Sequence, residues 1–245
     1  MVPENKKIVI VIPAFNAQKT IGVVLSRIPA EFITRTEKIY VINDGSLDGT
    51  LAEAESLKNK FSNIVIINKE INEGYARAQK TGFRRALNEG ADVIILLHAD
   101  GQYAPEELPR LTEPLIDGSA DVVQGSRMLG GALKGGMPLY KFLANKFLSK
   151  LENICYRMDL AEYHSGYMLY SGKALKTIPF EKLSDTFHFD GEMLFVANDL
   201  GLRIKEIAIP THYGGEKSNL KPIKYGFDVL KIMLRYKSGG YNFKK

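Results

Sequence analysis

Side chains that could bind a nucleotide and a metal ion follow three short apolar runs in the first half of the chain. An aromatic ring, Phe15, follows the first run, and a carboxylate, Asp44, ends the second. His98, Asp100 and Gln102 follow the third. An aromatic ring with a carboxylate suits a base and a ribose, and carboxylate and amide oxygens two residues apart suit a hard divalent ion that bridges phosphates. These residues predict a nucleotide site with a divalent metal.

Strands and helices that alternate along the chain would position these residues. Runs of β-branched residues, typical of buried strands, alternate with segments of helical spacing about four times in the first 125 residues. This alternation predicts an α/β fold with a mostly parallel sheet covered by helices on both faces. In such sheets, ligands bind beyond the carboxyl ends of the strands. We expect strands at 7–12, 38–43, 64–68, 93–97 and 122–125, and helices at 18–28, 49–60, 74–88 and 105–116.

The second half of the chain has a different character, which begins near Gly130. Four glycines within residues 130–136 predict a mobile loop. We therefore divide the chain into residues 1–129 and 130–245, two halves of one structural domain. In the second half we expect helices at 138–157, 191–200 and 223–236, and strands at 167–170 and 203–209.

The bulk composition favours a cytoplasmic protein that does not bind nucleic acid. The 33 Lys and Arg residues against 28 Asp and Glu give a formal charge of +5, which is only mildly basic. No stretch approaches the roughly 18 apolar residues that a membrane span needs, and the N-terminal residues do not resemble a signal peptide. The single cysteine, Cys155, cannot form an internal disulfide, which agrees with a reducing compartment.

Several motifs together resemble the family-2 glycosyltransferases, whose fold is GT-A. Residues 43–50 read Asn-Asp-Gly-Ser-Leu-Asp-Gly-Thr, and residues 98–102 read His-Ala-Asp-Gly-Gln in the position of the family's DxD-type metal motif. Weaker matches are Asn-Glu-Gly at 72–74, Gly-Ser-Arg at 125–127 and Ser-Gly-Tyr at 165–167. The resemblance to the dolichol-phosphate mannosyltransferase-like branch covers most of the chain.

The resemblance implies an enzyme that transfers a sugar from a nucleoside-diphosphate donor to an acceptor with inversion, using Mg²⁺ or Mn²⁺. Residues 1–129 would be the nucleotide-sugar-binding half and 130–245 the acceptor-side half. Asp100 would bind the metal with the help of Gln102, and Arg127 would contact phosphate oxygens. The positions implied to contact the donor are Pro13, Phe15, Ala17, Ile42, Asp44, His98, Ala99 and Lys217.

Three positions depart from the pattern of the family. His98 stands where the family usually has Asp. Its imidazole either ligates the ion or supports the ligands, and as a ligand it favours Mn²⁺ over Mg²⁺. An acidic residue is common in place of Ala17, so one ribose contact is missing, and Glu162 stands where the branch often has Asp.

The acceptor decides whether the reaction needs a general base. The branch implies a polyprenyl phosphate, which is already ionised and needs none. A soluble glycan acceptor, as in surface polysaccharide synthesis, is the alternative, and its hydroxyl would need a carboxylate to take the proton. Asp190 and Glu192 are the candidates, with N-capping of a helix as the structural alternative for Asp190. His164 is interpreted as a loop histidine with satisfied hydrogen bonds.

Other classes of protein fit the sequence less well. A sugar-1-phosphate nucleotidyltransferase or a Rossmann dehydrogenase needs glycines after the first strand, and residues 11–17 contain none. A non-catalytic nucleotide-binding module is the remaining alternative, favoured only by the replacement at His98. Hydrolysis of the donor, measured with and without Mn²⁺, separates it from an enzyme.

The segment 223–236 predicts an amphipathic helix. Ile223, Phe227, Leu230 and Leu234 recur at spacings of four, three and four, with lysines and arginines around them. One interpretation is that this stripe packs on the rest of the protein. The other is that the helix lies on an anionic membrane surface and meets a lipid carrier there, which would place the protein peripherally on the inner face of the membrane.

Overall fold

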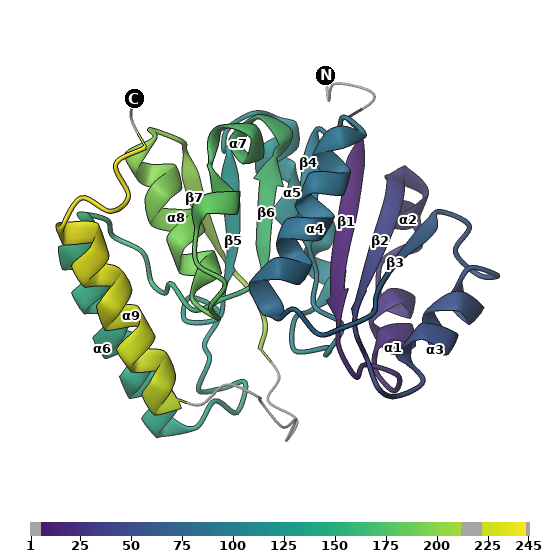
Figure 1. Ribbon diagram of the computed structural model, residues 1–245, viewed down its shortest axis with the longest axis horizontal. Helices are drawn as coiled ribbons and strands as arrows, with labels where there is room; N and C mark the ends of the chain where they lie inside the picture. The colour runs from purple at the N-terminus through teal and green to yellow at the C-terminus, as the bar shows by residue number, and fades with distance from the viewer. Residues whose placement is uncertain (1–5, 212–221, 244–245) are drawn as a thin grey trace.

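The computed structural model describes residues 6–211 and 222–243, which are built around one twisted sheet (Figure 1). Its strands are β1 (Ile8–Ala14), β2 (Thr36–Asp44), β3 (Ile64–Lys69), β4 (Val93–Leu96), β5 (Val122–Ser126), β6 (Met168–Ser171) and β7 (Ile204–Ala208). They lie in the order β3-β2-β1-β4-β6-β5-β7. Every pair is parallel except the two that involve β6, which runs antiparallel to β4 and β5. The predicted α/β fold with a mostly parallel sheet is confirmed.

Helices cover both faces of this sheet. They are α1 (Ile21–Ser26), α2 (Ala30–Arg35), α3 (Thr50–Leu57), α4 (Tyr75–Asn88), α5 (Leu108–Ile116), α6 (Leu139–Tyr156), α7 (Gly172–Thr177), α8 (Phe189–Asp199) and α9 (Pro222–Lys237). Side chains of α1, α2, α3 and α5 share one apolar cluster with the sheet. Side chains of α4, α7 and α8 share the other, on the opposite face. Two short 3-10 turns, Pro105–Glu107 and Phe180–Lys182, complete the described elements.

Strand β1 shows why its residues form a central strand. Successive side chains of a strand point to opposite faces, and both faces here are covered. Val9 and Val11 belong to the cluster under α4, and Ile10 and Ile12 belong to the cluster under α1 and α5. A Cβ atom at Gly82 of α4 would lie 2.1 Å from a methyl carbon of Val11, so the absence of a side chain there lets the helix pack directly on the strand. The carboxyl end of β1 is thereby fixed in the middle of the sheet.

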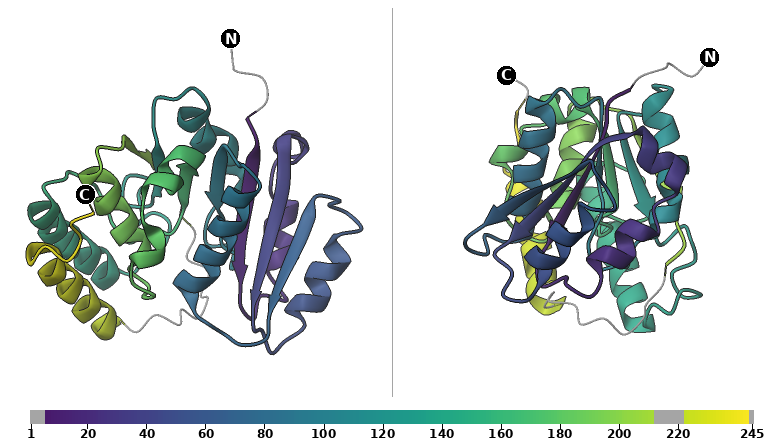
Figure 2. Two further views of the ribbon diagram at one scale, coloured as in Figure 1. Left: turned by 45° about the horizontal axis from the view of Figure 1, so that its top comes forward. Right: turned by 90° about the vertical axis from the view of Figure 1, so that its right-hand side faces the viewer.

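Helices α6 and α9 pack against each other beyond the β7 end of the sheet (Figures 1 and 2). Tyr156 at the end of α6 stacks on Phe195 of α8 with ring centroids 4.3 Å apart, and Tyr236 of α9 packs edge-on against the same tyrosine. Among the described side chains of α9, Val229 and Ile232 are the buried aliphatic ones. Aromatic contacts thus help attach the helix pair to the rest of the protein.

Three of the four residues of the apolar stripe predicted for residues 223–236 do not pack on the protein, and the side chain of the fourth, Ile223, lies outside the described ones. Phe227, Leu230 and Leu234 are 61%, 42% and 71% exposed, so the packing interpretation is wrong for them. The helix instead buries the face that carries Val229 and Ile232. Facing outward on α6 are further large apolar side chains: Leu139, Tyr140, Leu143, Phe147 and Ile154. No helix in the described ranges is long and apolar enough to cross a membrane.

The predicted elements match the observed ones closely, with three differences. The sequence analysis missed α2 and α7 and did not anticipate that β6 runs against its neighbours.

The glycine-rich segment 130–136 forms consecutive turns, and Gly130 and Gly135 lie against the backbone of Ile209 and Thr211. Its mobility stays a prediction. The sheet also crosses the division at residue 130, since β5 lies between β6 and β7.

Candidate active site

Loops that follow β1 and β2 are hydrogen-bonded to each other at the carboxyl edge of the sheet. The backbone N–H of Asn16 donates to Ser46 Oγ at 3.0 Å, and Asn16 Oδ1 accepts from the N–H of Leu47 at 2.9 Å. Asn16 has a φ of 52°, a left-handed conformation that asparagine tolerates better than most residues. This tight turn leaves Phe15 40% exposed beside the loop, as a base-stacking side chain requires.

Asp44 is more deeply engaged than the sequence indicated. It is buried, and its two oxygens accept from the backbone N–H groups of Glu73 at 3.2 Å and Gly74 at 2.9 Å. Lys69 Nζ lies 3.3 Å from Oδ1. Asp44 therefore anchors the loop that leads into α4, and its contact with a nucleoside stays a prediction.

Asp48 and Thr50, at the far end of the motif at residues 43–50, have structural roles. Asp48 accepts from the N–H of Thr50, the first residue of α3, at 3.0 Å, and from the N–H of Gln18 at 3.3 Å. Thr50 Oγ1 in turn accepts from the N–H of Ala17 at 2.8 Å. These bonds hold the first two loops in a fixed relation to each other.

Asp100 is presented on a turn just beyond β4. Its Oδ1 atom accepts from the N–H of Gln102 at 3.0 Å, and Gly101 between them has a φ of +78°. Asp100 is exposed and Gln102 half-buried. A carboxylate and an amide on one turn form an oxygen donor set of the kind that Mg²⁺ and Mn²⁺ bind.

His98 is held differently from Asp100. Its Nε2 atom lies 3.1 Å from the hydroxyl of Tyr75, and its ring packs edge-on against Tyr103. A Cβ atom at Gly166 would lie 2.7 Å from the His98 ring, so this glycine is required for the close approach of the two loops. Since Nε2 faces Tyr75, the Nδ1 atom is the one that remains for a metal or a phosphate.

Asp190, on α8, also contacts Tyr75. Its Oδ2 atom accepts from the Tyr75 hydroxyl at 2.6 Å, so Tyr75 links Asp190 to His98. Burial raises the pKa of the Asp190 carboxyl above its ordinary value. The N-cap alternative for Asp190 is wrong, because His188 occupies the N-cap position and Asp190 lies in the first turn of the helix.

Glu192 is not brought together with these residues. It is fully buried, and it accepts from the N–H of Ser184 at 2.6 Å and from the hydroxyl of Tyr241 near the C-terminus. These contacts tie the C-terminal segment to the loop before α8. Of the two predicted acidic residues, only Asp190 lies in the group that contains His98.

Arg127 follows β5 and is held by Glu162. The Arg127 Nη2 atom lies 2.8 Å from Glu162 Oε2, and its backbone N–H donates to Oε1 of the same carboxylate. The guanidinium also donates to the carbonyl oxygen of His164, and Asn145 of α6 donates to Glu162. Glu162, noted only as a departure from the family, is thus the residue that orients Arg127.

The remaining predicted donor contacts are small or apolar. Ile42, Ala99 and Ala17 have buried side chains within the apolar clusters, and Pro13 is half-buried. Their contact with a donor stays a prediction. Lys217 lies outside the described residues.

Tyr75 and Phe187 belong to the group around His98 and Asp190, and the sequence analysis missed both. Phe187 is partly exposed and stacks on Tyr75 with ring centroids 5.4 Å apart. Tyr75 is the first residue of α4, directly after the Asn-Glu-Gly motif, and this position is the one signal that could have indicated it. Phe187 carries no local signal, because only tertiary packing brings it to α4.

The pattern that defines glycosyl transferase family 2 matches residues 9–178, and the chain belongs to this family. It is 29% identical over 249 residues to the UDP-N-acetylglucosamine–dolichyl-phosphate N-acetylglucosaminyltransferase of Methanococcus voltae, covering 96% of this chain and 98% of that protein. It is 28% identical over 204 residues to the undecaprenyl-phosphate mannosyltransferase of Micrococcus luteus, covering 83% and 82% respectively.

Solved structures show the same fold. Glucosyl-3-phosphoglycerate synthase from Mycobacterium tuberculosis, in complex with Mn²⁺ and UDP-glucose, matches with a TM-score of 0.65 at 20% identity, covering 96% of this chain and 80% of the other. The predicted GT-A fold and the resemblance to family-2 glycosyltransferases are therefore confirmed. The chain is a glycosyltransferase.

Proposed function

We propose that the enzyme transfers a sugar, with inversion, from a nucleoside-diphosphate donor to a polyprenyl phosphate. The observation that carries this proposal is the exposed turn of Asp100 and Gln102 at the carboxyl end of β4, in the same sheet edge as Phe15. The relatives from Methanococcus voltae and Micrococcus luteus are named for lipid-phosphate acceptors, which supports this class of acceptor.

Asp100 and Gln102 would hold Mn²⁺ or Mg²⁺, and their oxygen donor set fits either ion. When bound, the ion supplies positive charge next to the donor diphosphate as it leaves. Phe15 would stack on the base, and Asp44 would accept from the nucleoside while it holds the loop before α4. Each of these residues then acts on the donor rather than on the acceptor.

Arg127 would position the acceptor phosphate. Glu162 fixes the orientation of the guanidinium before any ligand arrives. A phosphate acceptor is already ionised, so positioning against the anomeric carbon suffices and no general base is needed. A hydroxyl acceptor on a soluble glycan would instead need Asp190, whose raised pKa makes it a better proton acceptor than an ordinary carboxylate.

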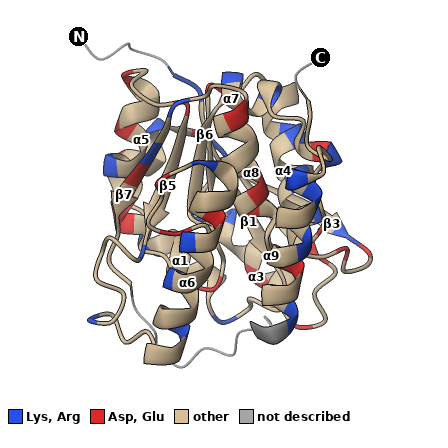
Figure 3. Ribbon diagram, turned by 90° about the vertical axis from the view of Figure 1, so that its left-hand side faces the viewer, with Lys and Arg blue, Asp and Glu red and all other residues tan. Residues whose placement is uncertain are grey.

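The exposed apolar residues of α6 and α9 would contact the membrane surface where a lipid carrier resides. Phe227, Leu230 and Leu234 project from α9, and Lys and Arg residues occur along both helices on this side of the molecule (Figure 3). Apolar side chains with nearby positive charge are the composition of an interfacial helix. The protein would then be cytoplasmic and peripherally bound.

The donor is identified by thermal shift with a panel of UDP-, GDP-, CMP- and dTDP-sugars, each with Mn²⁺ or Mg²⁺. The specific donor should raise the melting temperature, because a ligand that binds only the folded state stabilises it. Transfer from that donor to a short-chain polyprenyl phosphate, compared with the free polyprenol and a soluble glycan, then tests the acceptor. Transfer to the glycan alone would contradict the proposal.

A further inference from the structure

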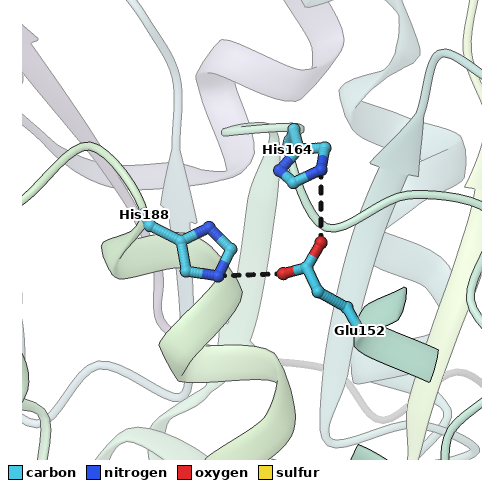
Figure 4. Close-up of side chains that lie close together, drawn as sticks. All are labelled: Glu152, His164 and His188. Atoms are coloured by element: carbon cyan, nitrogen blue, oxygen red, sulfur yellow. Dashed lines mark ion pairs between the residues drawn. The ribbon is translucent and has the colours of Figure 1, made fainter. Parts of the chain in front are cut away.

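A second polar cluster lies between the sheet and the α6–α9 pair, apart from the Asp100 turn. Glu152 of α6 lies with one carboxylate oxygen 3.2 Å from His164 Nε2 and the other 3.0 Å from His188 Nε2 (Figure 4). The opposite nitrogens of both rings contact the hydroxyl of Tyr225 on α9, at 2.7 Å for His164 Nδ1 and 3.1 Å for His188 Nδ1. Glu152 and His188 are buried and His164 is nearly so.

The four side chains are joined in a closed cycle by four polar contacts. If both histidines are neutral, there are too few hydrogens to provide one for each contact. The Tyr225 hydroxyl carries one hydrogen and each neutral imidazole carries one, so three hydrogens serve four contacts. The Glu152 carboxylate carries none. All four contacts are satisfied only if the cluster holds one further positive charge, and that charge is either a proton or a metal ion.

The geometry of the contacts between Glu152 and the two histidines favours a metal ion. The two Glu152 oxygens and the two Nε2 atoms are buried, and none of them makes a hydrogen bond among the described residues despite distances of 3.0 and 3.2 Å. One ligand atom from each residue lies within 4.8 Å of the others. Bonds of about 2.0–2.1 Å to a tetrahedral ion separate its ligand atoms by about 3.3 Å. Each Nε2 atom lies at about this distance from the Glu152 oxygen that faces it, Oε2 for His164 and Oε1 for His188.

We propose that Glu152, His164 and His188 bind a divalent transition-metal ion of the Zn²⁺ type. Two imidazole nitrogens and one carboxylate oxygen suit Zn²⁺, Co²⁺ or Ni²⁺, whereas Mg²⁺ prefers a set made of oxygens. Tyr225 contacts the ring nitrogen opposite each ligand atom and so fixes both rings, as partners of metal-binding histidines commonly do. On this proposal His164 is a metal ligand and not only a loop histidine with satisfied hydrogen bonds.

Such an ion joins parts of the chain that are far apart in sequence. Glu152 comes from α6, His164 from the loop before β6, and His188 from the N-cap of α8, while Tyr225 brings in α9. The ion would therefore fasten the helix pair to the sheet as a structural site. The proposal can be tested without the transfer reaction, because its readout is the binding of a metal ion and none of its residues belongs to the Asp100 turn.

The test uses Asp100→Asn protein, which lacks the carboxylate of the proposed catalytic metal site and keeps the cluster. After chelator treatment and dialysis, Zn²⁺ is titrated by calorimetry, and bound metal is measured after gel filtration. We expect one tightly bound ion per chain, and a rise in melting temperature of about 5 °C or more at saturating Zn²⁺. Mg²⁺ at the same concentration should produce no such rise.

Variants in the same Asp100→Asn background assign the ligands. Glu152→Gln should lower Zn²⁺ affinity at least ~100-fold, and Tyr225→Phe, which removes only the supporting hydroxyl, about 10- to 100-fold. Glu192→Gln is the matched control: it alters another fully buried glutamate, on α8, whose partners are Ser184 and Tyr241. Its affinity for Zn²⁺ should stay unchanged.

Absorption of the Co²⁺-loaded protein keeps the proposal testable if Glu152→Gln does not fold. Visible bands typical of tetrahedral Co²⁺ are expected in the Asp100→Asn protein, shifted in Tyr225→Phe. The proposal is overturned if the folded Asp100→Asn protein binds no Zn²⁺ and keeps the same melting temperature with Zn²⁺ and with chelator. Equal Zn²⁺ affinity in Glu152→Gln and Glu192→Gln would overturn it as well.

Discussion

The carboxyl edge of β1, β2 and β4 and the space under the α6–α9 pair are two polar regions built in opposite ways. At the sheet edge, neighbouring strands each end in a short turn that presents a side chain outward, as Phe15 and Asp100 show. Under the helix pair, Glu152 and His188 are buried and come from helices far apart in sequence. An exposed arrangement suits ligands that bind and leave, whereas the buried one suits a group that stays.

The largest effect should come from the exposed region. Asp100→Asn should lower transfer activity about a hundred- to a thousandfold, because the carboxylate proposed to hold the metal is lost while the turn is kept. Steady-state rates over a range of Mn²⁺ concentrations measure this. Asp117→Asn, an exposed carboxylate on the turn after α5, is the control and should keep full activity. An unchanged rate for Asp100→Asn would remove the proposed metal site.

A buried ion pair should matter more for stability than a surface pair. Glu162→Gln leaves the Arg127 guanidinium without its carboxylate and should lower the free energy of unfolding by about 3 kcal/mol. Asp121→Asn breaks the exposed pair with Arg203 and should cost at most about 1 kcal/mol. Urea denaturation compares the two. Equal losses would show that Glu162 does not hold Arg127 as the structure indicates.

Substitutions on the outward face of α9 should weaken membrane contact and leave folding unchanged. Combined Phe227→Glu and Leu234→Glu should reduce binding to anionic liposomes about tenfold or more, because two exposed apolar side chains become anionic. The melting temperature should change little, since both side chains face outward. Lys231→Gln is the control for charge alone and should weaken binding by about 1 kcal/mol. Liposome flotation at low and high salt gives the measurement, and equal flotation of all three proteins would exclude this face as the contact.

The smallest effect concerns the pH dependence of stability. Burial raises the folded-state pKa of Asp190, so its contribution to stability is present below the unfolded pKa and is lost as pH rises through the folded pKa. Asp190→Asn cannot ionise and keeps an acceptor for Tyr75. Its melting temperature relative to wild type should therefore rise as the pH is raised from about 4 to about 8.

A matched variant should show the opposite sign. The hydrogen bond from Arg203 lowers the pKa of Asp121, so that carboxylate stabilises the fold above its unfolded pKa and loses this effect as pH falls. Asp121→Asn should accordingly lose stability relative to wild type as pH rises. Parallel curves for the two variants would contradict the different environments assigned to these carboxylates.

The sequence predicted the sheet edge better than the buried cluster, for a physical reason. Apolar runs and strand-end turns are local patterns, and the parallel sheet then brings Phe15, Asp44 and Asp100 to one edge. The partners of Asp44 in the loop before α4 could not be foreseen, because that contact depends on how two loops pack. Tyr75 and Glu162 were missed as site residues for the same reason.

The buried cluster depends on tertiary structure alone. Glu152, His188 and Tyr225 lie on three helices, and no spacing along the chain connects them. Local sequence around His164 favoured an ordinary loop residue. The exposed face of α9 was also open to two interpretations, because the sequence does not show which of two apolar helix faces is covered. In the structure, the covered face is the one that carries Val229 and Ile232.

The reversed strand β6 limits how hybrid enzymes can be made from this chain. If residues 130–245 were exchanged with those of a relative, β5 would come from one parent. Both of its neighbours, β6 and β7, would come from the other. It would also separate Arg127 from Glu162. A recombination point before β5 keeps these three strands and that ion pair in one parent, so the junction between α5 and β5 is the better place to recombine donor and acceptor specificities.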